Sequence, residues 1–330
     1  MIIHLKKESA KQRIQDLINH TAGITFDQSG QTVLVTSSKI KSVPESFHSL
    51  IKEQFVMESD IQLAHNSYIK KRSVKIGQLE LGTNQSTHLM AGPCSVESWD
   101  QLDRSASFLN GLGIKTIRAG CFKPRTSPYT FQGLGEEGLR LLIKVREKYG
   151  LNIITEVKDS THVDLVLKHA DIIQIGTKAM YDTSILRACG RTKKPVLLKR
   201  GFGSTLQEFV QAAEFILSQG NPNVLLCERG IRTFESKTRF TLDLTGIAFL
   251  KEYTNLPVVV DPSHAMGYRY GVADLTRAAV AMGVDGLLIE THPNPEKALS
   301  DAAQQLDFPT FEQMYSTLNP VAEAVGRKKS

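Results

Sequence analysis

The sequence predicts a (β/α)8 barrel with a small α+β domain in front of it. Two observations carry this prediction. Eight short apolar segments alternate with helical patterns between residues 88 and 290, and residues 1–70 follow a different order of elements. The chain has 330 residues, which accommodates a barrel of about 250 residues and one small appendage.

Residues 1–70 are expected to form a ferredoxin-like βαββαβ domain. The predicted strands cover residues 1–6, 23–27, 32–36 and 55–63, and the predicted helices cover residues 9–21 and 44–54. Apolar residues at helical spacing, such as Ile14, Leu17 and Ile18, indicate the helices. The alternative is an appendage that only packs on the barrel or mediates oligomerisation.

A polar and basic stretch at residues 66–73 is expected to link this domain to the barrel. Residues 74–81 are expected to form a hairpin around Gly77. We place the boundary at residue 70, so that the predicted domains are residues 1–70 and 71–330.

Short apolar segments bounded by polar residues, Gly or Pro indicate buried parallel strands in the second domain. They cover residues 88–91, 116–119, 152–156, 172–175, 196–199, 224–227, 257–261 and 286–290. Helical patterns lie between them, including residues 135–149 and a capping-box pattern formed by Thr205 and Glu208. A doubly wound open sheet is the alternative, but no Gly-x-Gly-x-x-Gly motif follows the first strand.

The composition is that of a globular protein, with 41% apolar and 22% charged residues. No apolar run approaches the ~20 residues that span a bilayer, and the first seven residues do not resemble a signal peptide. We therefore expect a cytoplasmic protein without a membrane partner. The net charge of +6 comes from Lys and Arg spread along the chain, which favours small anionic substrates over nucleic acid.

Charged and polar side chains follow nearly every predicted barrel strand, at the end where such barrels carry their active sites. The candidates for binding anions or for acid–base chemistry are Arg118, Lys123, Arg125, Glu156, Gln174, Lys199, Arg200, Arg229 and Asp261. Converging cations repel one another unless an anionic ligand is present, and Arg matches the geometry of phosphate and carboxylate. Taken alone, Arg118, Lys199 and Arg229 could instead be ion-pair partners within the barrel rim.

Four further residues from the same rim form a potential metal site: Cys94, His264, Glu290 and Asp301. A thiolate, an imidazole and two carboxylates suit a divalent ion such as Mn²⁺, Fe²⁺, Co²⁺ or Zn²⁺. Taken singly, each has a more common structural explanation. The chain has no Cys-x-x-Cys pair, and Cys121, Cys189 and Cys227 are expected to be structural.

Five segments in order resemble the signature segments of the 3-deoxy-7-phosphoheptulonate (DAHP) synthases. They read Ala-Gly-Pro-Cys-Ser-Val-Glu at residues 91–97, Lys-Pro-Arg-Thr-Ser-Pro at 123–128, Leu-Lys-Arg-Gly at 198–201, Cys-Glu-Arg-Gly at 227–230 and Asp-Pro-Ser-His at 261–264. The resemblance covers about residues 74–320 and is closest to the short-barrel, type I beta subgroup. It implies condensation of phosphoenolpyruvate with erythrose 4-phosphate at the start of the shikimate pathway.

The resemblance also implies residue roles. Cys94, His264, Glu290 and Asp301 would bind the metal, with Mn²⁺ first among the candidates. Arg118, Lys123, Lys199 and Arg229 would contact phosphoenolpyruvate, with Arg200, Gln174 and Asp261 nearby. Lys123, Pro124, Arg125 and Thr126 would form the erythrose 4-phosphate loop. Lys123, Cys94, His264 and Glu156 would take part in catalysis. A homotetramer and a Phe or Tyr effector that binds residues 1–70 are implied as well.

Two alternatives remain open at this point. The octulosonate 8-phosphate synthases use arabinose 5-phosphate, but their corresponding loop typically reads Lys-Ala-Asn-Arg-Ser-Ser, and some replace the metal-binding Cys by Asn. A non-catalytic sugar-phosphate-binding protein would need the cationic rim but not Cys94, His264, Glu290 and Asp301 together.

Overall fold

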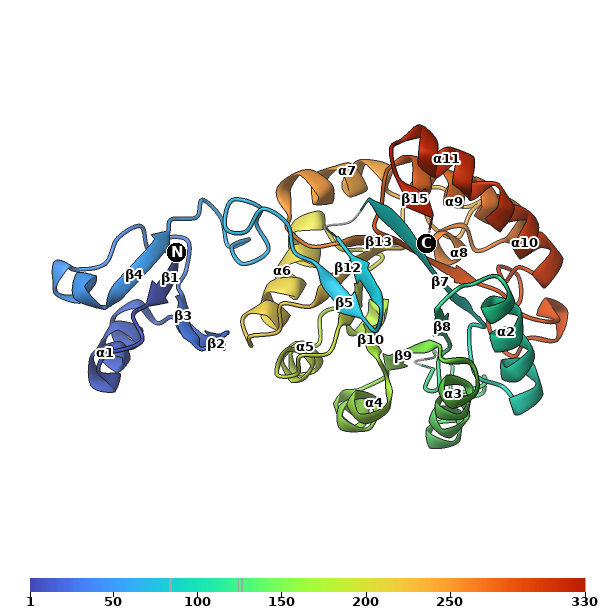
Figure 1. Ribbon diagram of the computed structural model, residues 1–330, viewed down its shortest axis with the longest axis horizontal. Helices are drawn as coiled ribbons and strands as arrows, with labels where there is room; N and C mark the ends of the chain where they lie inside the picture. Colours follow the sequence, from blue (N-terminus) through green and yellow to red (C-terminus); the bar gives the residue numbers. More distant parts are fainter. Residues whose placement is uncertain (83–84, 124, 126, 330) are drawn as a thin grey trace.

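The computed structural model describes residues 1–82, 85–123, 125 and 127–329, and it contains the predicted barrel (Figure 1). Within these residues, eight parallel strands pair in sequence order, and the last pairs with the first. They are β7 Ser86–Gly92, β8 Thr116–Arg118, β9 Asn152–Val157, β10 Ile172–Ile175, β11 Val196–Lys199, β12 Val224–Glu228, β13 Val258–Val260 and β14 Gly286–Glu290. The (β/α)8 prediction is confirmed, and the open sheet is excluded.

Helices surround the barrel, and their buried apolar residues belong to one core with those of the strands. They are α2 Trp99–Gly111, α3 Glu136–Tyr149, α4 Val163–His169, α5 Thr183–Gly190, α6 Leu206–Leu217, α7 Leu244–Tyr253, α8 Pro262–Met266, α9 Arg269–Ala281, α10 Phe308–Ser316 and α11 Leu318–Ala324. Short 3₁₀ helices cover Ser160–His162, Thr177–Ala179 and Pro295–Lys297, and β15 Lys328–Lys329 pairs with the start of β7. The capping box of Thr205 and Glu208 is formed at the start of α6. None of the helices in the described residues is long and apolar enough to cross a membrane.

A hairpin closes the amino-terminal end of the barrel. It consists of β5 Val74–Ile76 and β6 Leu79–Leu81, as predicted. Val74, Ile76 and Leu81 pack against inward-facing strand residues such as Leu197 and Val259. With this end filled by apolar side chains, the opposite end is the one that can open to solvent.

The N-terminal residues form an antiparallel sheet with the strand order β2-β3-β1-β4. Its elements are β1 Ile2–Leu5, α1 Lys11–Thr21, β2 Ile24–Gln28, β3 Gln31–Val35, a 3₁₀ helix Glu45–Leu50 and β4 Ile51–Phe55. Ile3, Leu17, Leu34 and Leu50 belong to a separate small core of this sheet.

The second half of this N-terminal segment corrects two predictions. The expected helix at residues 44–54 is a 3₁₀ helix that ends at Leu50, and the expected strand at 55–63 is instead Ile51–Phe55. Ile2 pairs with Phe55 and His4 with Glu53, so β4 is the second strand that pairs with β1, after β3. This non-local pairing overrides the helical spacing of nearby apolar residues.

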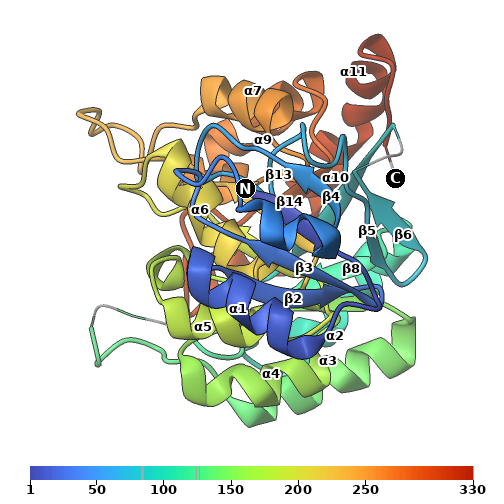
Figure 2. The same ribbon diagram turned by 90° about the vertical axis from the view of Figure 1, so that its left-hand side faces the viewer.

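The sheet lies beside the barrel, on the side that carries α5 and α6 (Figure 1 and Figure 2). A cavity of about 280 Å³ between them is lined by Phe26 and Ser29 from the sheet and by Lys193 and Gly220 from the barrel. Lys193 and Gly220 come before β11 and β12, so they belong to the amino-terminal end of the barrel. The predicted boundary at residue 70 stays a prediction.

Candidate active site

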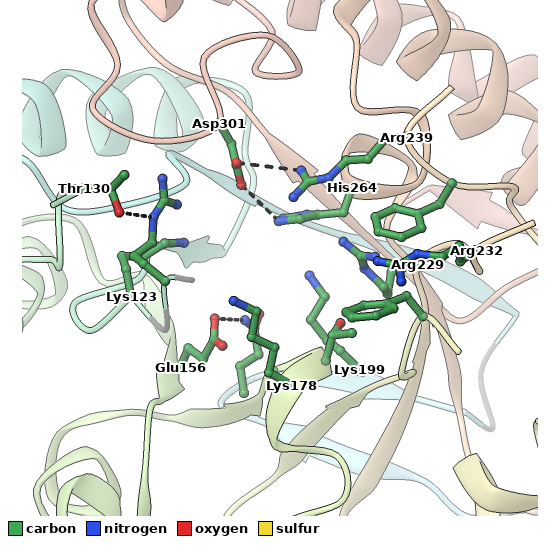
Figure 3. Close-up of a pocket in the computed structure, with 16 residues that line it drawn as sticks. Lys123, Thr130, Glu156, Lys178, Lys199, Arg229, Arg232, Arg239, His264 and Asp301 are labelled. Atoms are coloured by element: carbon green, nitrogen blue, oxygen red, sulfur yellow. Dashed lines mark hydrogen bonds and ion pairs between the residues drawn. The ribbon is translucent and has the colours of Figure 1, made fainter. Parts of the chain in front are cut away.

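The carboxyl ends of the barrel strands surround a cavity of about 490 Å³ (Figure 3). Lys123 and Glu156 lie on one side of it and face Lys199 and Arg229, while His264 and Asp301 lie at one end. Each of these residues comes from a strand end or from the loop that follows a strand. The barrel register therefore brings together residues that are up to 178 positions apart in the chain, from Lys123 to Asp301.

Three of the predicted metal ligands converge at this end of the cavity. Donor atoms of Cys94, Glu290 and Asp301 all lie within 4.8 Å of one another. The fourth, His264, places its Nε2 3.6 Å from Glu290 Oε1 and 3.6 Å from Asp301 Oδ2. Pairing of Glu290 with Gly92 puts the end of β14 beside the turn that carries Cys94. The donor set fits a borderline divalent metal ion.

Neighbouring side chains fix the orientation of these donors. Gln304 Nε2 donates to Glu290 Oε2 at 2.6 Å, and Gln305 Oε1 accepts from the backbone N–H of Cys94 at 2.9 Å. The Asp261 carboxylate lies 2.8 Å from His264 Nδ1, which leaves Nε2 directed towards the acids. Such outer partners set the orientation of metal-binding side chains. The prediction from sequence did not include Gln304 or Gln305.

Charges around this group keep both acids ionised. Burial opposes ionisation of Asp301, but His264, Lys123 and Arg239 hold its pKa well below the usual range. Burial likewise opposes ionisation of Glu290, and its pKa is lowered by His264 and Arg118. Burial raises the pKa of the Cys94 thiol to about 12, with Glu290 acting in the same direction.

Two buried cations lie against this group. Lys123 Nζ is 3.1 Å from Cys94 Sγ and 3.2 Å from Cys94 O. Arg118 Nη1 donates to Glu290 Oε1 at 2.7 Å and to Pro93 O at 3.0 Å. Burial lowers the pKa of Lys123, but Cys94 and Glu156 outweigh that effect and raise it, so the ammonium stays protonated.

The opposite wall of the cavity is cationic. Arg229 is 4% exposed, and neither its Nε nor its Nη1 has a hydrogen-bond partner within the described residues. Its guanidinium lies 4.4 Å from the ring centre of Phe240. Lys199 beside it forms an ion pair with Asp261. Buried N–H groups without a partner are costly, so an anionic ligand at Arg229 would satisfy them.

The remaining predicted residues are placed differently. Glu156 accepts a hydrogen bond from Gln174 at 3.0 Å, and both line the cavity, as does Arg125. Arg118 lines a smaller space next to it, together with Cys94. Pro124 and Thr126 lie outside the described residues.

Arg200 pairs with acids of the protein and is not among the cavity residues, and its expected place near phosphoenolpyruvate stays a prediction. It donates to Glu228 at 2.8 Å and to Asp243 at 2.8 Å, and it is absent from the cavity lining. Glu228, which is buried, and Asp243, which is partly buried, both pair with its guanidinium, so the protein already compensates its charge.

Several cavity residues were missed from sequence. They are Thr130, Thr177, Lys178, Phe202, Arg232, Arg239 and Phe240. All lie in segments after strands, where no periodic pattern marks them. The one available signal was the run of arginines 229, 232 and 239 after the sixth barrel strand.

Comparisons with known proteins agree with this geometry. The model of the DAHP synthetase I family matches residues 60–327. The chain is 40% identical over 337 residues to phospho-2-dehydro-3-deoxyheptonate aldolase of Thermotoga maritima, and the match covers 99% of both proteins. It is 35% identical over 252 residues to 2-dehydro-3-deoxyphosphooctonate aldolase of Syntrophotalea carbinolica, covering 71% of this chain and 90% of that protein.

Solved structures give the same result. The crystal structure of the Thermotoga maritima DAHP synthase superimposes with a TM-score of 0.81 at 37% identity, covering 100% of this chain and 99% of that one. A truncated form of that enzyme superimposes with a TM-score of 0.76 at 40% identity, covering 81% and 98%. The resemblance seen in the five sequence segments is thereby confirmed, and the chain belongs to the DAHP synthetase I family.

Proposed function

We propose that this cavity condenses phosphoenolpyruvate with erythrose 4-phosphate to DAHP and phosphate. The observation that carries the proposal is that one cavity is lined both by residues of a candidate metal site and by several cations. Two phosphorylated substrates need several cations, and Lys123 supplies them from one side of the cavity and Lys199 and Arg229 from the facing side. A binding protein would need the cations but not the buried donors Cys94 and Glu290.

In the proposed reaction the enol carbon of phosphoenolpyruvate attacks the aldehyde carbon of erythrose 4-phosphate. Water adds to the second carbon of the enol, and phosphate leaves as its C–O bond breaks. Arg229 and Lys199 hold phosphoenolpyruvate by its anionic groups, and Arg125 binds the sugar phosphate. Holding both substrates in one cavity supplies much of the rate increase.

Protonated Lys123 is placed to donate a proton to the alkoxide that forms from the aldehyde. Glu156, on the same side of the cavity, supplies a carboxylate for the attacking water. We propose that Cys94, His264, Glu290 and Asp301 hold Mn²⁺, with Fe²⁺, Co²⁺ or Zn²⁺ as alternatives. When bound, such an ion supplies Lewis-acid polarisation to an oxygen in the cavity.

A phosphate-release assay tests this proposal. The purified protein with phosphoenolpyruvate, erythrose 4-phosphate and Mn²⁺ should release phosphate, and chelation should abolish turnover until Mn²⁺ is restored. Full activity of the chelated, metal-free enzyme would remove the metal from the mechanism.

Replacing erythrose 4-phosphate by arabinose 5-phosphate separates the heptulosonate and octulosonate activities. The heptulosonate activity is favoured by the 40% identical relative, whose match covers 99% of the chain. Faster turnover with arabinose 5-phosphate would reverse the assignment.

We also propose that the N-terminal sheet binds Phe or Tyr as a feedback inhibitor, at an interface between subunits of a homotetramer in the cytoplasm. The sheet lies beside α5 and α6, and none of its described residues lines the active-site cavity of its own chain. Removing residues 1–58 should preserve turnover and abolish inhibition, and light scattering should report the tetramer. An unchanged inhibition curve would contradict this regulatory role.

A further inference from the structure

Gln304 uses both ends of its amide group at the boundary between the metal-binding group and the cavity wall. It is 1% exposed and lies in the loop between Asp301 and α10. Its Nε2 donates to Glu290 Oε2 at 2.6 Å, and its Oε1 accepts from Arg239 Nη1 at 2.8 Å. The donor end thus faces a metal ligand, and the acceptor end faces a cation that lines the cavity.

Each of these two neighbours depends on Gln304 for its position. Arg118 holds the other oxygen of Glu290, Oε1, at 2.7 Å, so Gln304 completes the pair of donors that fixes this carboxylate. Arg239 has a second contact, at 3.7 Å, to Asp301 Oδ1. Its side chain is 41% exposed, so without Gln304 only this longer contact and the nearby Phe240 ring would hold it in the cavity.

The chemistry of the position requires an uncharged group that donates on one side and accepts on the other. An amide side chain does both at once. A carboxylate would repel Glu290, and an apolar side chain would leave that carboxylate oxygen and Arg239 without their hydrogen bonds. A shift of the Glu290 carboxylate would therefore move Gln304, and through Gln304 it would move Arg239.

We propose that Gln304 is a positioning residue that couples metal binding to the binding of phosphoenolpyruvate in the cavity. A metal ion that fixes Glu290 also fixes Gln304, and Gln304 then holds Arg239 ready for an anionic ligand. Linkage is reciprocal, so phosphoenolpyruvate must tighten metal binding by the same factor. This inference rests on the proposed function, because it takes Glu290 as a metal ligand and the cavity as the substrate site.

The test is the affinity for Mn²⁺ with and without saturating phosphoenolpyruvate, measured by equilibrium dialysis and by the paramagnetic resonance spectrum of free Mn²⁺. For the wild-type protein we expect about 5- to 20-fold tighter Mn²⁺ binding with phosphoenolpyruvate, the lower part of the usual range of such couplings. In Gln304→Met the ratio should fall to less than about half of the wild-type value, because the direct contacts of Lys123 with Cys94 and of Arg118 with Glu290 remain. Mn²⁺ binding without the substrate should also weaken.

Two further variants distinguish the contact of Gln304 with Glu290 from its contact with Arg239. Arg239→Met should lower the ratio as Gln304→Met does, but it should not weaken Mn²⁺ binding in the absence of phosphoenolpyruvate, because it removes a cation that lies 3.7 Å from Asp301. It also keeps the test open if Gln304→Met fails to fold. Gln305→Met is the matched control, because Gln305 supports Cys94 and does not contact Arg239. It should weaken Mn²⁺ binding and preserve the ratio.

A wild-type ratio of 1, or an unchanged ratio in both Gln304→Met and Arg239→Met, would overturn the coupling. Turnover of the wild-type protein in the phosphate-release assay distinguishes that failure from a failure of the proposed function. If the wild-type protein turns over and the ratios do not change, only the inference about Gln304 is lost.

Discussion

Arg118 and Glu290 form a buried ion pair across the mouth of the barrel, with Nη1 and Oε1 2.7 Å apart. Arg118 ends β8 and Glu290 ends β14, so β7 lies between their strands. Both side chains are at most 4% exposed. The guanidinium compensates the charge of a carboxylate that we assign to the metal, which is a different task from the substrate contact expected of Arg118.

Arg118→Met should destabilise the metal-free protein by about 3 kcal/mol or more, because Glu290 loses its buried counter-charge. Added Mn²⁺ should restore part of this loss, since the ion supplies positive charge beside the same carboxylate. Urea unfolding with and without Mn²⁺ measures both effects. Arg146→Met is the control: its pair with Asp171 is about one-third exposed and should contribute less than about 1 kcal/mol. Equal losses in the two variants would contradict the argument.

Cys94→Ser should weaken binding of Mn²⁺, Co²⁺ and Zn²⁺ at least about tenfold, a loss typical of a disturbed metal site. A hydroxyl is a poorer ligand than a thiolate for the softer ions, so Zn²⁺ and Co²⁺ should lose more than Mn²⁺. Cys121→Ser is the matched control, because Cys121 is also buried but lies outside the donor group. Metal titrations of the two variants measure the difference, and equal affinities would remove Cys94 from the site.

Arg229→Met should raise the KM for phosphoenolpyruvate about 10- to 100-fold, the factor expected for hydrogen bonds to a charged group. The same change should leave the stability of the ligand-free protein equal or higher, because it removes two buried donor nitrogens that have no partner among the described residues. Arg200→Met should behave in the opposite way. It should destabilise the fold by about 3 kcal/mol, since Glu228 loses its partner, and change KM less. Steady-state kinetics and unfolding curves on both variants decide the assignment.

The same sequence pattern predicted the barrel, which the structure confirms, and the positions of the candidate metal donors, whose role stays a prediction. Buried parallel strands are short apolar runs with polar ends, so locating the strands also located Cys94, Glu156 and Glu290 at one rim. The capping box at Thr205 was predicted correctly because it is a local motif. These successes depend on information contained within about ten consecutive residues.

The misses depend on contacts between distant residues. Residues Ile51–Phe55 form a strand because their backbone pairs with β1. The local spacing of apolar residues does not reveal this pairing. Gln304 and Arg239 are paired across a loop region without periodicity, and Arg200 follows the same strand as Lys199 yet turns to Asp243. A charged residue after a strand can serve the cavity or the scaffold, and only the position of its partner distinguishes the two.

The junction between the sheet and the barrel contains a partly buried acid, Glu214. Glu214, on α6, accepts hydrogen bonds from three consecutive backbone N–H groups, those of Gln62 at 2.7 Å, Leu63 at 3.1 Å and Ala64 at 2.8 Å. Burial raises the pKa of Glu214 from 4.5 to about 7, although these three bonds and Arg72 act in the opposite direction. This carboxyl group therefore titrates near neutral pH in the folded protein.

Because the pKa of Glu214 is higher in the folded state than in the unfolded state, its contribution to stability is complete below about pH 4.5 and is lost as the pH rises through about 7. Between pH 5.5 and 8.5 the wild-type protein should lose about 2 kcal/mol from this group. Glu214→Gln cannot titrate, so the difference in unfolding free energy between the two proteins isolates the effect from other groups. Glutamine also keeps an acceptor for Gln62 and Ala64, which share one oxygen of Glu214. Urea unfolding at both pH values measures the difference, and parallel stability profiles for the two proteins would show that Glu214 stays ionised throughout.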